Sequence, residues 1–462
     1  MIIAKRLKGK AIATWLGPTG DAARRALTRA RQRITNAPSR LDFYFDIADP
    51  MSYLTAQAVS RLVAAYPVEL AVHVITPPAS DVDPAPGLRP RHAVRDARLI
   101  AEYWNVDFPA HREADGALVR EVGTALIRDR PAADQLRAAI ELAGAMWRGD
   151  KKRLGELLLA HGTESSSSVA PILNTNYAEL RKAGHYQGAM LAYDGTWYWG
   201  IDRLPYLEAA LAEATGVAAA PVDPTGGSAP RPAGRAVGVP TPRLPPVVAP
   251  RPEAERGPLK LSDPPLVCEL WFSFRSPYSY LALERIEAVL APYRVPLVLK
   301  PVAPMVARGM PLPNVKRMYI VRDAKREADR HGIPFGELCD PLGPGIDHCI
   351  AIAHRAAQHG QAMAFARSAM RGIWAEALDM TEYVDLRRVV ERAGMAWDDA
   401  RTALTPEAAG EAVKAAQANA TELAVYSLWG VPSMRCGEFV AWGQDRLDLL
   451  ADRLRRHALA TR

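Results

Sequence analysis

The sequence predicts an α/β protein built from two copies of one domain, and three observations point to this arrangement. Residues 216–265 hold thirteen of the 38 prolines, and proline is excluded from the interior of helices and sheets. The segments on the two sides of this stretch carry the same landmarks in the same order. Within each segment, short strand-like runs alternate with helix-like runs, which is typical of a sheet covered by helices.

The division of the chain follows from the Pro-rich stretch. A chain of 462 residues has room for two or three domains. We expect a basic tail over residues 1–40, a first domain over 41–215, a Pro-rich linker over 216–265 and a second domain over 266–462.

The repeat is visible as a constant offset between matching residues. An offset of 227 positions links Phe45 with Phe272, Pro50 with Pro277, Tyr53 with Tyr280, Leu54 with Leu281 and Trp147 with Trp374. Near the end of each copy the offset grows to 243, where Trp199-Gly200 matches Trp442-Gly443. One offset that is kept over more than 100 residues indicates a tandem duplication.

Each copy contains the same order of expected elements. The runs 41–45 and 267–272 are apolar or alternate, as first strands do. In the second copy we expect a helix, a strand, a long helical stretch, two short strands and a last helix at 280–290, 297–300, 315–425, 433–436, 438–442 and 446–457. A βαβ half and a ββα half, separated by inserted helices, follow the order of a thioredoxin-like fold. The predicted fold class is therefore α/β, with two thioredoxin-like domains that each carry a helical insertion.

Positive charge is concentrated in the tail. Residues 1–40 contain ten Lys and Arg residues and one acid, so the remaining chain is close to neutral although the whole carries +7. A near-neutral body argues against a nucleic-acid partner, and no apolar run reaches the roughly 18 residues of a membrane span. A solvated arm, a contact with an anionic surface and a targeting segment are alternatives for residues 1–40.

Cysteine usage argues against one large class of thioredoxin-like chemistry. The chain has four cysteines, and no two of them form a Cys-x-x-Cys pair. A dithiol redox centre and a zinc site are therefore not expected, and we predict no metal site. Sparse cysteine usage is typical of a reducing compartment, so we expect a cytoplasmic protein.

The first candidate for chemistry is the turn after the first strand of the second copy. In α/β units, the loop at the carboxyl end of a strand and the following helix N-terminus form the usual binding crevice. Ser276 lies in this turn, directly before Pro277. Its hydroxyl can donate to a thiolate or an oxyanion, and a helix N-terminus lowers the pKa of a thiol placed beside it. The alternative is a serine that only caps the helix.

The second candidate is Gly430-Val431-Pro432, ahead of the strand expected at 433–436. A cis X–Pro bond at this place would expose the backbone of Val431, which could then pair with a peptide ligand as an added strand would. An ordinary trans proline at the start of a strand is the alternative.

Other polar residues could hold the charged ends of a ligand. Gln444 and Asp445 precede the last helix, and their side chains can bind an amino-acid-like ammonium and carboxylate. Lys316 and Arg317 can pair with a second carboxylate. The alternatives are a helix cap for Asp445 and solvated helix charges for the two cations.

Together these segments resemble one family. The second copy, from about residue 266 to 457, is similar to the 2-hydroxychromene-2-carboxylate isomerase family, which is close to kappa-class glutathione transferases within the DsbA-like group. The motifs that carry the resemblance are Phe272-x-Phe274-x-Ser276-Pro277-Tyr278-Ser279-Tyr280-Leu281, Lys316-Arg317-x-Tyr319, Gly332-Ile333-Pro334-Phe335, Gly430-Val431-Pro432 and Trp442-Gly443-Gln444-Asp445-Arg446.

The resemblance implies glutathione as the cofactor and a small molecule of the aromatic-degradation type as the substrate. Ser276 would be the catalytic residue beside the glutathione thiolate, and Val431 with Pro432 would pair with the peptide backbone. The implied reaction is a double-bond isomerisation, in which a thiolate adds to a conjugated carbon, the resulting single bond rotates and the thiol leaves.

The resemblance also places the ends of the ligand. The γ-glutamyl end would lie near Gln444 and Asp445, and Lys316 would reach the glycyl end or the substrate. Tyr278 and Trp442 are expected to contact the substrate.

One departure from the family pattern concerns the loop before Lys316. The family usually has a Gly-Asn-x-Pro stretch, whereas this chain has Gly309-Met310-Pro311 preceded by Arg308, so a polar ligand contact is missing at Met310. Alternative functions are a kappa-like glutathione transferase or peroxidase, and a non-catalytic thioredoxin-like scaffold.

The first copy differs at the same positions. Asp49 matches Ser276, and a carboxylate there would repel a thiolate. The other matches are Met51 with Tyr278, Arg89 with Lys316, Ile201 with Gln444, and Gly188-Ala189-Met190 with Gly430-Val431-Pro432. We therefore expect a first domain without chemistry. Because members of the family are commonly dimers, the resemblance implies that this domain pairs with the second domain within one chain, or that the protein forms a homodimer.

Overall fold

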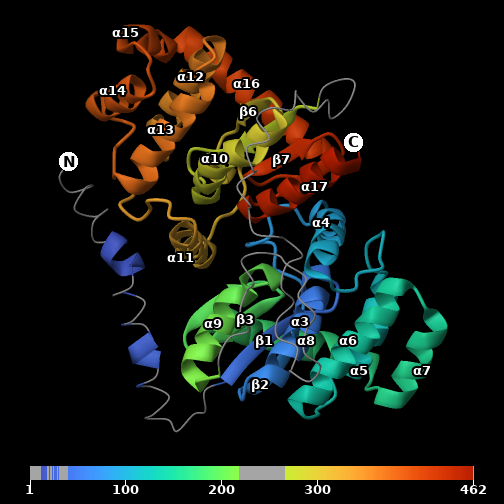
Figure 1. Ribbon diagram of the computed structural model, residues 1–462. Helices are drawn as coiled ribbons and strands as arrows, with labels where there is room; N and C mark the ends of the chain where they lie inside the picture. Colours follow the sequence, from blue (N-terminus) through green and yellow to red (C-terminus); the bar gives the residue numbers. More distant parts are fainter. Residues whose placement is uncertain are drawn as a thin grey trace. The chain divides into compact units, whose positions relative to one another are not determined.

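A computed structural model shows two four-stranded sheets, each with its own set of helices (Figure 1). The structure describes residues 12–17, 20, 23, 25–28, 30, 40–217 and 266–460. Most of the expected tail over 1–40, and the expected linker over 216–265 apart from its first two residues, lie outside the described residues. The chain divides into two compact units, Met1–Ala23 with Pro252–Arg462 and Arg24–Arg251. The stretch expected to form one tail is therefore shared between the two units.

The first domain is built around strand β1, which lies inside the sheet of order β2-β1-β3-β4. Strand β1 is parallel to β2 and antiparallel to β3, so that Phe43 lies between Val72 and Leu191. The elements of this domain are β1 (Arg40–Asp46), α3 (Pro50–Ala65), β2 (Glu69–Ile75), α4 (Arg89–Trp104), α5 (Gly116–Leu126), α6 (Ala132–Arg148), α7 (Lys151–His161), α8 (Ser166–Ala183), β3 (Met190–Tyr193), β4 (Thr196–Trp199) and α9 (Leu204–Thr215).

The second domain has the same sheet order, β6-β5-β7-β8, with β5 parallel to β6 and antiparallel to β7. Its elements are β5 (Cys268–Phe272), α10 (Pro277–Leu290), β6 (Leu297–Pro301), α11 (Asn314–Arg330), α12 (Pro344–Gln358), α13 (Ala362–Ala375), α14 (Tyr383–Arg392), α15 (Trp397–Ala400), α16 (Pro406–Val425), β7 (Ser433–Cys436), β8 (Phe439–Trp442) and α17 (Leu447–Ala460). The predicted α/β class, with a helical insertion in each thioredoxin-like domain, is confirmed.

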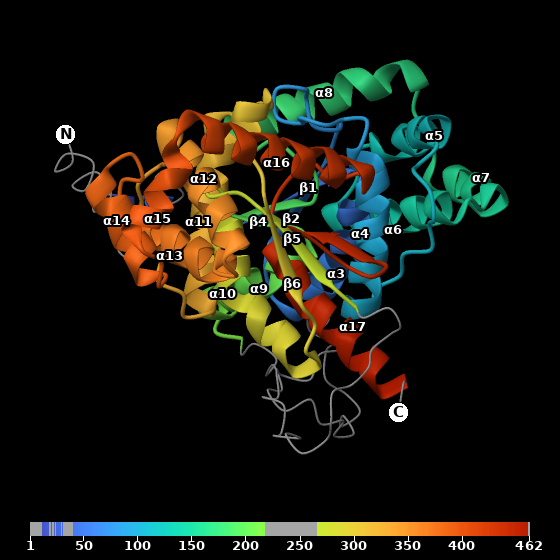
Figure 2. The same cartoon turned by 90° about the horizontal axis from the view of Figure 1, so that it is seen from above.

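Helices cover both faces of the second sheet. Figure 2 shows α16 along one side of β5 and β6, and α10 with α17 along the other. Trp271 of β5 is fully buried against Leu423 and Leu428 on the α16 side, and its indole N–H donates to the carbonyl of Asn419 at 3.0 Å. Burying this large side chain with its polar atom satisfied stabilises the sheet-to-helix contact without leaving an unpaired donor.

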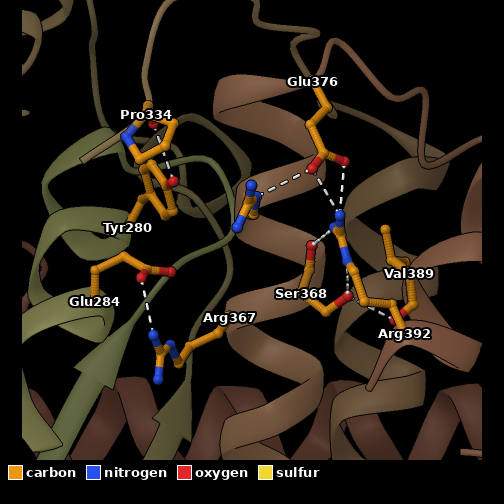
Figure 3. A network of polar contacts seen from close by, with 9 residues as sticks. Tyr280, Glu284, Pro334, Arg367, Ser368, Glu376, Val389 and Arg392 are labelled. Carbon is orange, nitrogen blue, oxygen red and sulfur yellow. Dashed lines mark hydrogen bonds and ion pairs between the residues drawn. The ribbon is translucent and has the colours of Figure 1, made fainter. Parts of the chain in front are cut away.

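A polar network fixes the inserted helices to α10 (Figure 3). The Tyr280 hydroxyl donates to the carbonyl of Pro334 at 3.0 Å, and Arg367 of α13 pairs with Glu284 at 3.0 Å. Further along the insertion, Arg392 of α14 donates to Ser368 at 2.9 Å and pairs with Glu376 at 2.7 Å. The insertion is therefore anchored to the helix that begins at the predicted active-site turn.

A short N-terminal segment packs on the second domain. Residues 12–16 are helical, Leu16 is buried, and the guanidinium of Arg322 on α11 lies 4.3 Å from the centroid of the Trp15 ring. Part of the stretch expected as a basic tail thus contacts α11 through an aromatic residue. None of the helices in the described ranges has both the length and the apolar character that a membrane crossing requires.

Strand pairing corrects one match between the two domains. Phe43 pairs with Leu191, and Leu270 pairs with Met434. The N–H of Gly200 bonds the carbonyl of Ala189 at 2.9 Å, as the N–H of Gly443 bonds that of Pro432 at 2.9 Å. Ala189 therefore stands at the position of Pro432, and the predicted match of Pro432 with Met190 is wrong by one residue.

The turn after β1 carries two carboxyl groups. Asp49 caps α3 by accepting from the N–H of Met51 at 3.2 Å and of Ser52 at 3.0 Å. Asp46 is 1% exposed, and one of its carboxylate oxygens has no hydrogen-bond partner within the described part of the chain. Burial, together with the negative charge of Asp49, raises the pKa of Asp46 to about 7. Ionised Asp46 is therefore unfavourable in the folded state.

This arrangement predicts a pH-dependent gain in stability for Asp46→Asn. An unfolded Asp ionises near pH 4, whereas folded Asp46 ionises at about 7, so folding is most favoured below pH 4 and loses stability as the pH rises to 7. Asn cannot ionise and still accepts the N–H of Ala48. We expect the variant to gain about 1–3 kcal/mol at pH 8 and little at pH 4, measured as thermal midpoints. The exposed control Asp129→Asn should change little at either pH, and an equal gain for Asp46→Asn at both values would contradict the electrostatic account.

Candidate active site at the Ser276 turn

Ser276 lies between β5 and α10, and its side chain joins two parts of the domain. Its backbone is extended, with φ −100° and ψ 113°, and its Oγ accepts the N–H of Ser279 at 3.2 Å. The same hydroxyl lies 3.2 Å from the main-chain carbonyl of Val431, to which it donates. Helix capping, the simpler alternative, and contact with the 430–432 loop are therefore both present in one side chain.

The 430–432 loop faces the N-terminus of α10. The Val431–Pro432 peptide is cis, the first of the two alternatives predicted for it. Val431 is partly exposed, and its main-chain N–H donates to no residue among those described. The Ser276 hydroxyl and the Val431 backbone are thus close together, with hydrogen-bonding capacity left for a ligand.

Two indole rings pack beside this loop. Trp429 and Trp442 contact each other edge to face, with ring centroids 4.9 Å apart. A Cβ placed on Gly430 would lie 2.0 Å from Cζ2 of Trp442, so the ring rests directly on the glycine. Trp442 therefore lies at the predicted site, and its contact with a substrate stays a prediction.

Gln444 is buried, and both ends of its side-chain amide are hydrogen-bonded within the domain. It is 1% exposed, its Oε1 accepts from Arg285 at 2.5 Å, and its Nε2 donates to Glu327 at 2.6 Å. Both ends of the amide are engaged, so this geometry argues against the predicted ligand contact and gives Gln444 a structural role. Asp445 keeps a partly exposed carboxylate, 3.4 Å from the guanidinium of Arg446.

Tyr278 and Lys316 connect the site with α11. The Tyr278 hydroxyl donates to Asp323 at 2.7 Å, and Asp323 also pairs with Arg326 at 2.5 Å. Tyr278 thus ties the first turn of α10 to α11 through a buried carboxylate. Lys316 lies partly buried in the first turn of α11. Substrate or cofactor contacts of these two residues stay predictions.

The structure adds an anchor that sequence reasoning missed. Arg275, directly before Ser276, makes two bonds to the carboxylate of Asp340, both at 2.8 Å. Burial favours a raised pKa for Asp340, but the Arg275 guanidinium outweighs it and holds the pKa below its usual value. The Trp374 indole N–H adds a 3.2 Å bond to the carbonyl of Phe274. Because these partners are distant in sequence, no local motif predicts them.

The thiols of the chain lie elsewhere. All four cysteines are free and buried, and Cys268 faces Cys436 across β5 and β7. Cys268 begins β5, whereas Ser276 follows the other end of that strand. Within the described residues, no group of three or more His, Cys, Asp or Glu side chains is arranged to hold a metal ion.

Comparison with known proteins identifies the fold family of the second domain. Residues 267–455 match the DsbA-like thioredoxin domain. The chain is 27% identical over 206 residues to 2-hydroxychromene-2-carboxylate isomerase of Pseudomonas putida, covering 41% of this chain and 95% of that protein.

Two solved structures match the chain at lower identity. A structure of 2-hydroxychromene-2-carboxylate isomerase matches with 23% identity and a TM-score of 0.36, covering 41% of this chain and 95% of that one. The cytosolic disulfide reductase DsbM of Pseudomonas aeruginosa matches with 17% identity and a TM-score of 0.34, covering 41% and 98%.

The contact of Trp442 with Gly430 predicts a large cost for Gly430→Ala. The added methyl group must displace the indole ring, so we expect a loss of about 1–3 kcal/mol in unfolding free energy, measured by urea denaturation. In a Trp442→Ala background the same change should cost much less. Gly410→Ala on α16, where a Cβ meets nothing within 4 Å, should be neutral or stabilising. Equal costs in both backgrounds would show that the ring contact is not the cause.

Proposed function

We propose that the DsbA-like thioredoxin domain over residues 267–455 binds glutathione at the Ser276 turn and isomerises a small molecule of the aromatic-degradation type. The observation that carries this proposal is the 3.2 Å contact between the Ser276 hydroxyl and the Val431 carbonyl, which brings a donor and a peptide-like edge together at a helix N-terminus. The 27% identity with an isomerase supports the reaction type.

The residues at the turn fit a tripeptide thiol. Ser276 and the N-terminus of α10 favour an anion, since the helix dipole is positive at that end. The main-chain N–H of Val431, which donates to none of the described residues, suits a peptide backbone. Lys316 and Asp445 offer opposite charges for the two charged ends of glutathione. Gln444 acts indirectly, because it holds Arg285 and Glu327 beneath the turn.

Bound glutathione supplies a nucleophilic thiolate that adds reversibly to a conjugated carbon and so permits rotation about the neighbouring bond. The chain contributes orientation and pKa control. By rotating away from Val431, the Ser276 hydroxyl can donate to the sulfur, and together with the positive end of the α10 dipole it favours the ionised thiol. Trp442 and Trp429 form an apolar wall that limits water beside the turn.

A glutathione transferase or peroxidase of the kappa type is the second candidate. The same turn would then present the thiolate to an electrophile instead of a double bond. Met310 favours this alternative, because it stands where the isomerase family has a polar side chain. A dithiol mechanism has no support, since Ser276 and Ser279 occupy the positions that such chemistry gives to cysteines.

The first domain is part of the same proposal as a non-catalytic partner that arose by tandem duplication. Its sheet order equals that of the second domain, which supports a common origin. Asp46 and Asp49 place two acidic groups where a thiolate would have to lie, and like charges there would disfavour ionisation. The first domain therefore contributes a fold but no glutathione site.

Replacement of Ser276 tests the proposal. Ser276→Ala removes a hydrogen bond to an ionised group, so we expect about 10- to 100-fold lower kcat/KM with glutathione and a hydroxychromene carboxylate. Ser276→Asp keeps a good helix cap but adds a negative charge, as in the first domain, and loses the bond to the Val431 carbonyl, so it should abolish activity while the protein stays folded, as circular dichroism will show. Activity is followed by absorbance, and binding of glutathione by calorimetry.

Asp49→Ala provides the matched control in the first domain. Activity should stay within about twofold, because Asp49 caps α3 and has no part in the reaction. Wild type that binds no glutathione would contradict the proposal. Binding without turnover of a hydroxychromene carboxylate would favour the transferase or peroxidase alternative, and a larger loss in Asp49→Ala would show that the first domain takes part.

A further inference from the structure

Arg308 lies in the loop between β6 and α11, where its guanidinium is partly buried. Its Nε donates to the carbonyl of Ala303 at 3.0 Å, and its NH2 donates to the carbonyl of Trp429 at 2.8 Å. In the part of the chain that the structure describes, no carboxylate forms an ion pair with this side chain. Arg308 thus brings a positive charge to the 429–432 loop without an acid to balance it.

Other arginines of this domain with low exposure are paired differently. Arg275 pairs with Asp340 at 2.8 Å, and Arg285 pairs with Asp448 at 2.7 Å. Burial lowers the pKa of Arg308, which means that desolvation penalises its charged form. A guanidinium nevertheless stays charged in proteins, and main-chain carbonyls leave its net charge uncompensated. An anion bound from solution would provide that compensation.

The position of Arg308 connects it with the Ser276 turn. Trp429 and Val431 are two residues apart, so their Cα atoms are separated by at most about 7 Å. Arg308 contacts the carbonyl of the first, and Ser276 contacts the carbonyl of the second. The cation and the hydroxyl therefore hold the same short loop, and a ligand of tripeptide size at Val431 has an end within reach of Arg308.

We propose that Arg308 determines specificity at the Ser276 site by pairing with a carboxylate of the bound ligand. This inference rests on the proposed glutathione-dependent function. Two groups can supply this carboxylate: the glycyl end of glutathione and the carboxylate of the substrate. Arg308 lies two residues before Met310, so a charged contact from this loop compensates for the polar side chain missing there.

The experiment compares wild type with Arg308→Met by calorimetry, using glutathione and glutathione glycine monoethyl ester as probes. A charge-assisted bond to carboxylate predicts that the variant binds glutathione about 10- to 100-fold more weakly. The ester lacks that charge, so it should bind both proteins equally. Because Arg308→Met also removes the bond to Trp429, the ester serves as the control for damage to the loop.

A second arm identifies the substrate as the source. The variant can lose the same affinity for glutathione as for its ester. In that case the KM for 2-hydroxychromene-2-carboxylate at saturating glutathione should rise at least about tenfold, with kcat little changed. Arg387→Met, on the exposed face of α14, is the matched control and should change none of these values.

The inference is overturned if Arg308→Met retains its affinity for glutathione and its KM within about twofold. It is also overturned if the variant loses affinity for glutathione and for its ester equally while KM stays constant. Arg308 would then affect binding only by holding the loop in place. Failure of wild type to bind glutathione is a distinct result, which removes the proposed function and this inference together.

Discussion

The hydrogen bond from the Ser276 hydroxyl to the Val431 carbonyl links the two chain segments on which the second domain's site depends. One segment is the N-terminus of α10, held in place by Arg275 with Asp340 and by the bond of Trp374 to Phe274. The other is the 429–432 loop. Most of the polar contacts around the turn serve to fix one of these segments against the rest of the domain, as a preorganised site requires.

The two domains show how one fold can hold different electrostatics. In both, a serine hydroxyl accepts the N–H that ends the first strand: Ser52 bonds Asp46 at 3.2 Å, and Ser279 bonds Ser273 at 3.3 Å. The scaffold of the turn is therefore the same, but Asp46 and Asp49 replace two neutral hydroxyls with acids. The two acids disfavour an anion at this turn of the first domain, which illustrates that function resides in a few side chains rather than in the fold.

Local pattern was sufficient to predict most of the fold. The strand at 267–272 and the Ser-Pro start of the following helix follow from alternation and capping, although α10 begins at Pro277 rather than at residue 280 because proline is favoured in the first turn. The resemblance implied that Ser276 and Val431 bind one ligand, and the structure adds their direct hydrogen bond. The match of Ala189, rather than Met190, with Pro432 required the structure, because only strand pairing distinguishes the two residues.

Side-chain roles that depend on tertiary contacts were beyond the sequence. Gln444 looks like a ligand-binding amide, yet it is buried between Arg285 and Glu327, which come from α10 and α11. Arg275 pairs with Asp340, which lies 65 residues away in the sequence, and no spacing predicts that pair. Such contacts depend on how inserted helices return to the sheet, and burial rather than residue type decides which polar groups can reach a ligand.

In the function we propose, the Ser276 turn stabilises the ionised thiol of bound glutathione. The most direct measurement is the pH titration of glutathione's thiolate absorbance in the presence of saturating protein. The thiol of a free cysteine has a pKa of about 8.5. The account predicts that the thiol pKa falls by at least about one unit on binding to wild type, and that this fall is lost in Ser276→Ala. A bound thiol that titrates as it does in free solution, or a fall that persists without the hydroxyl, would contradict the account.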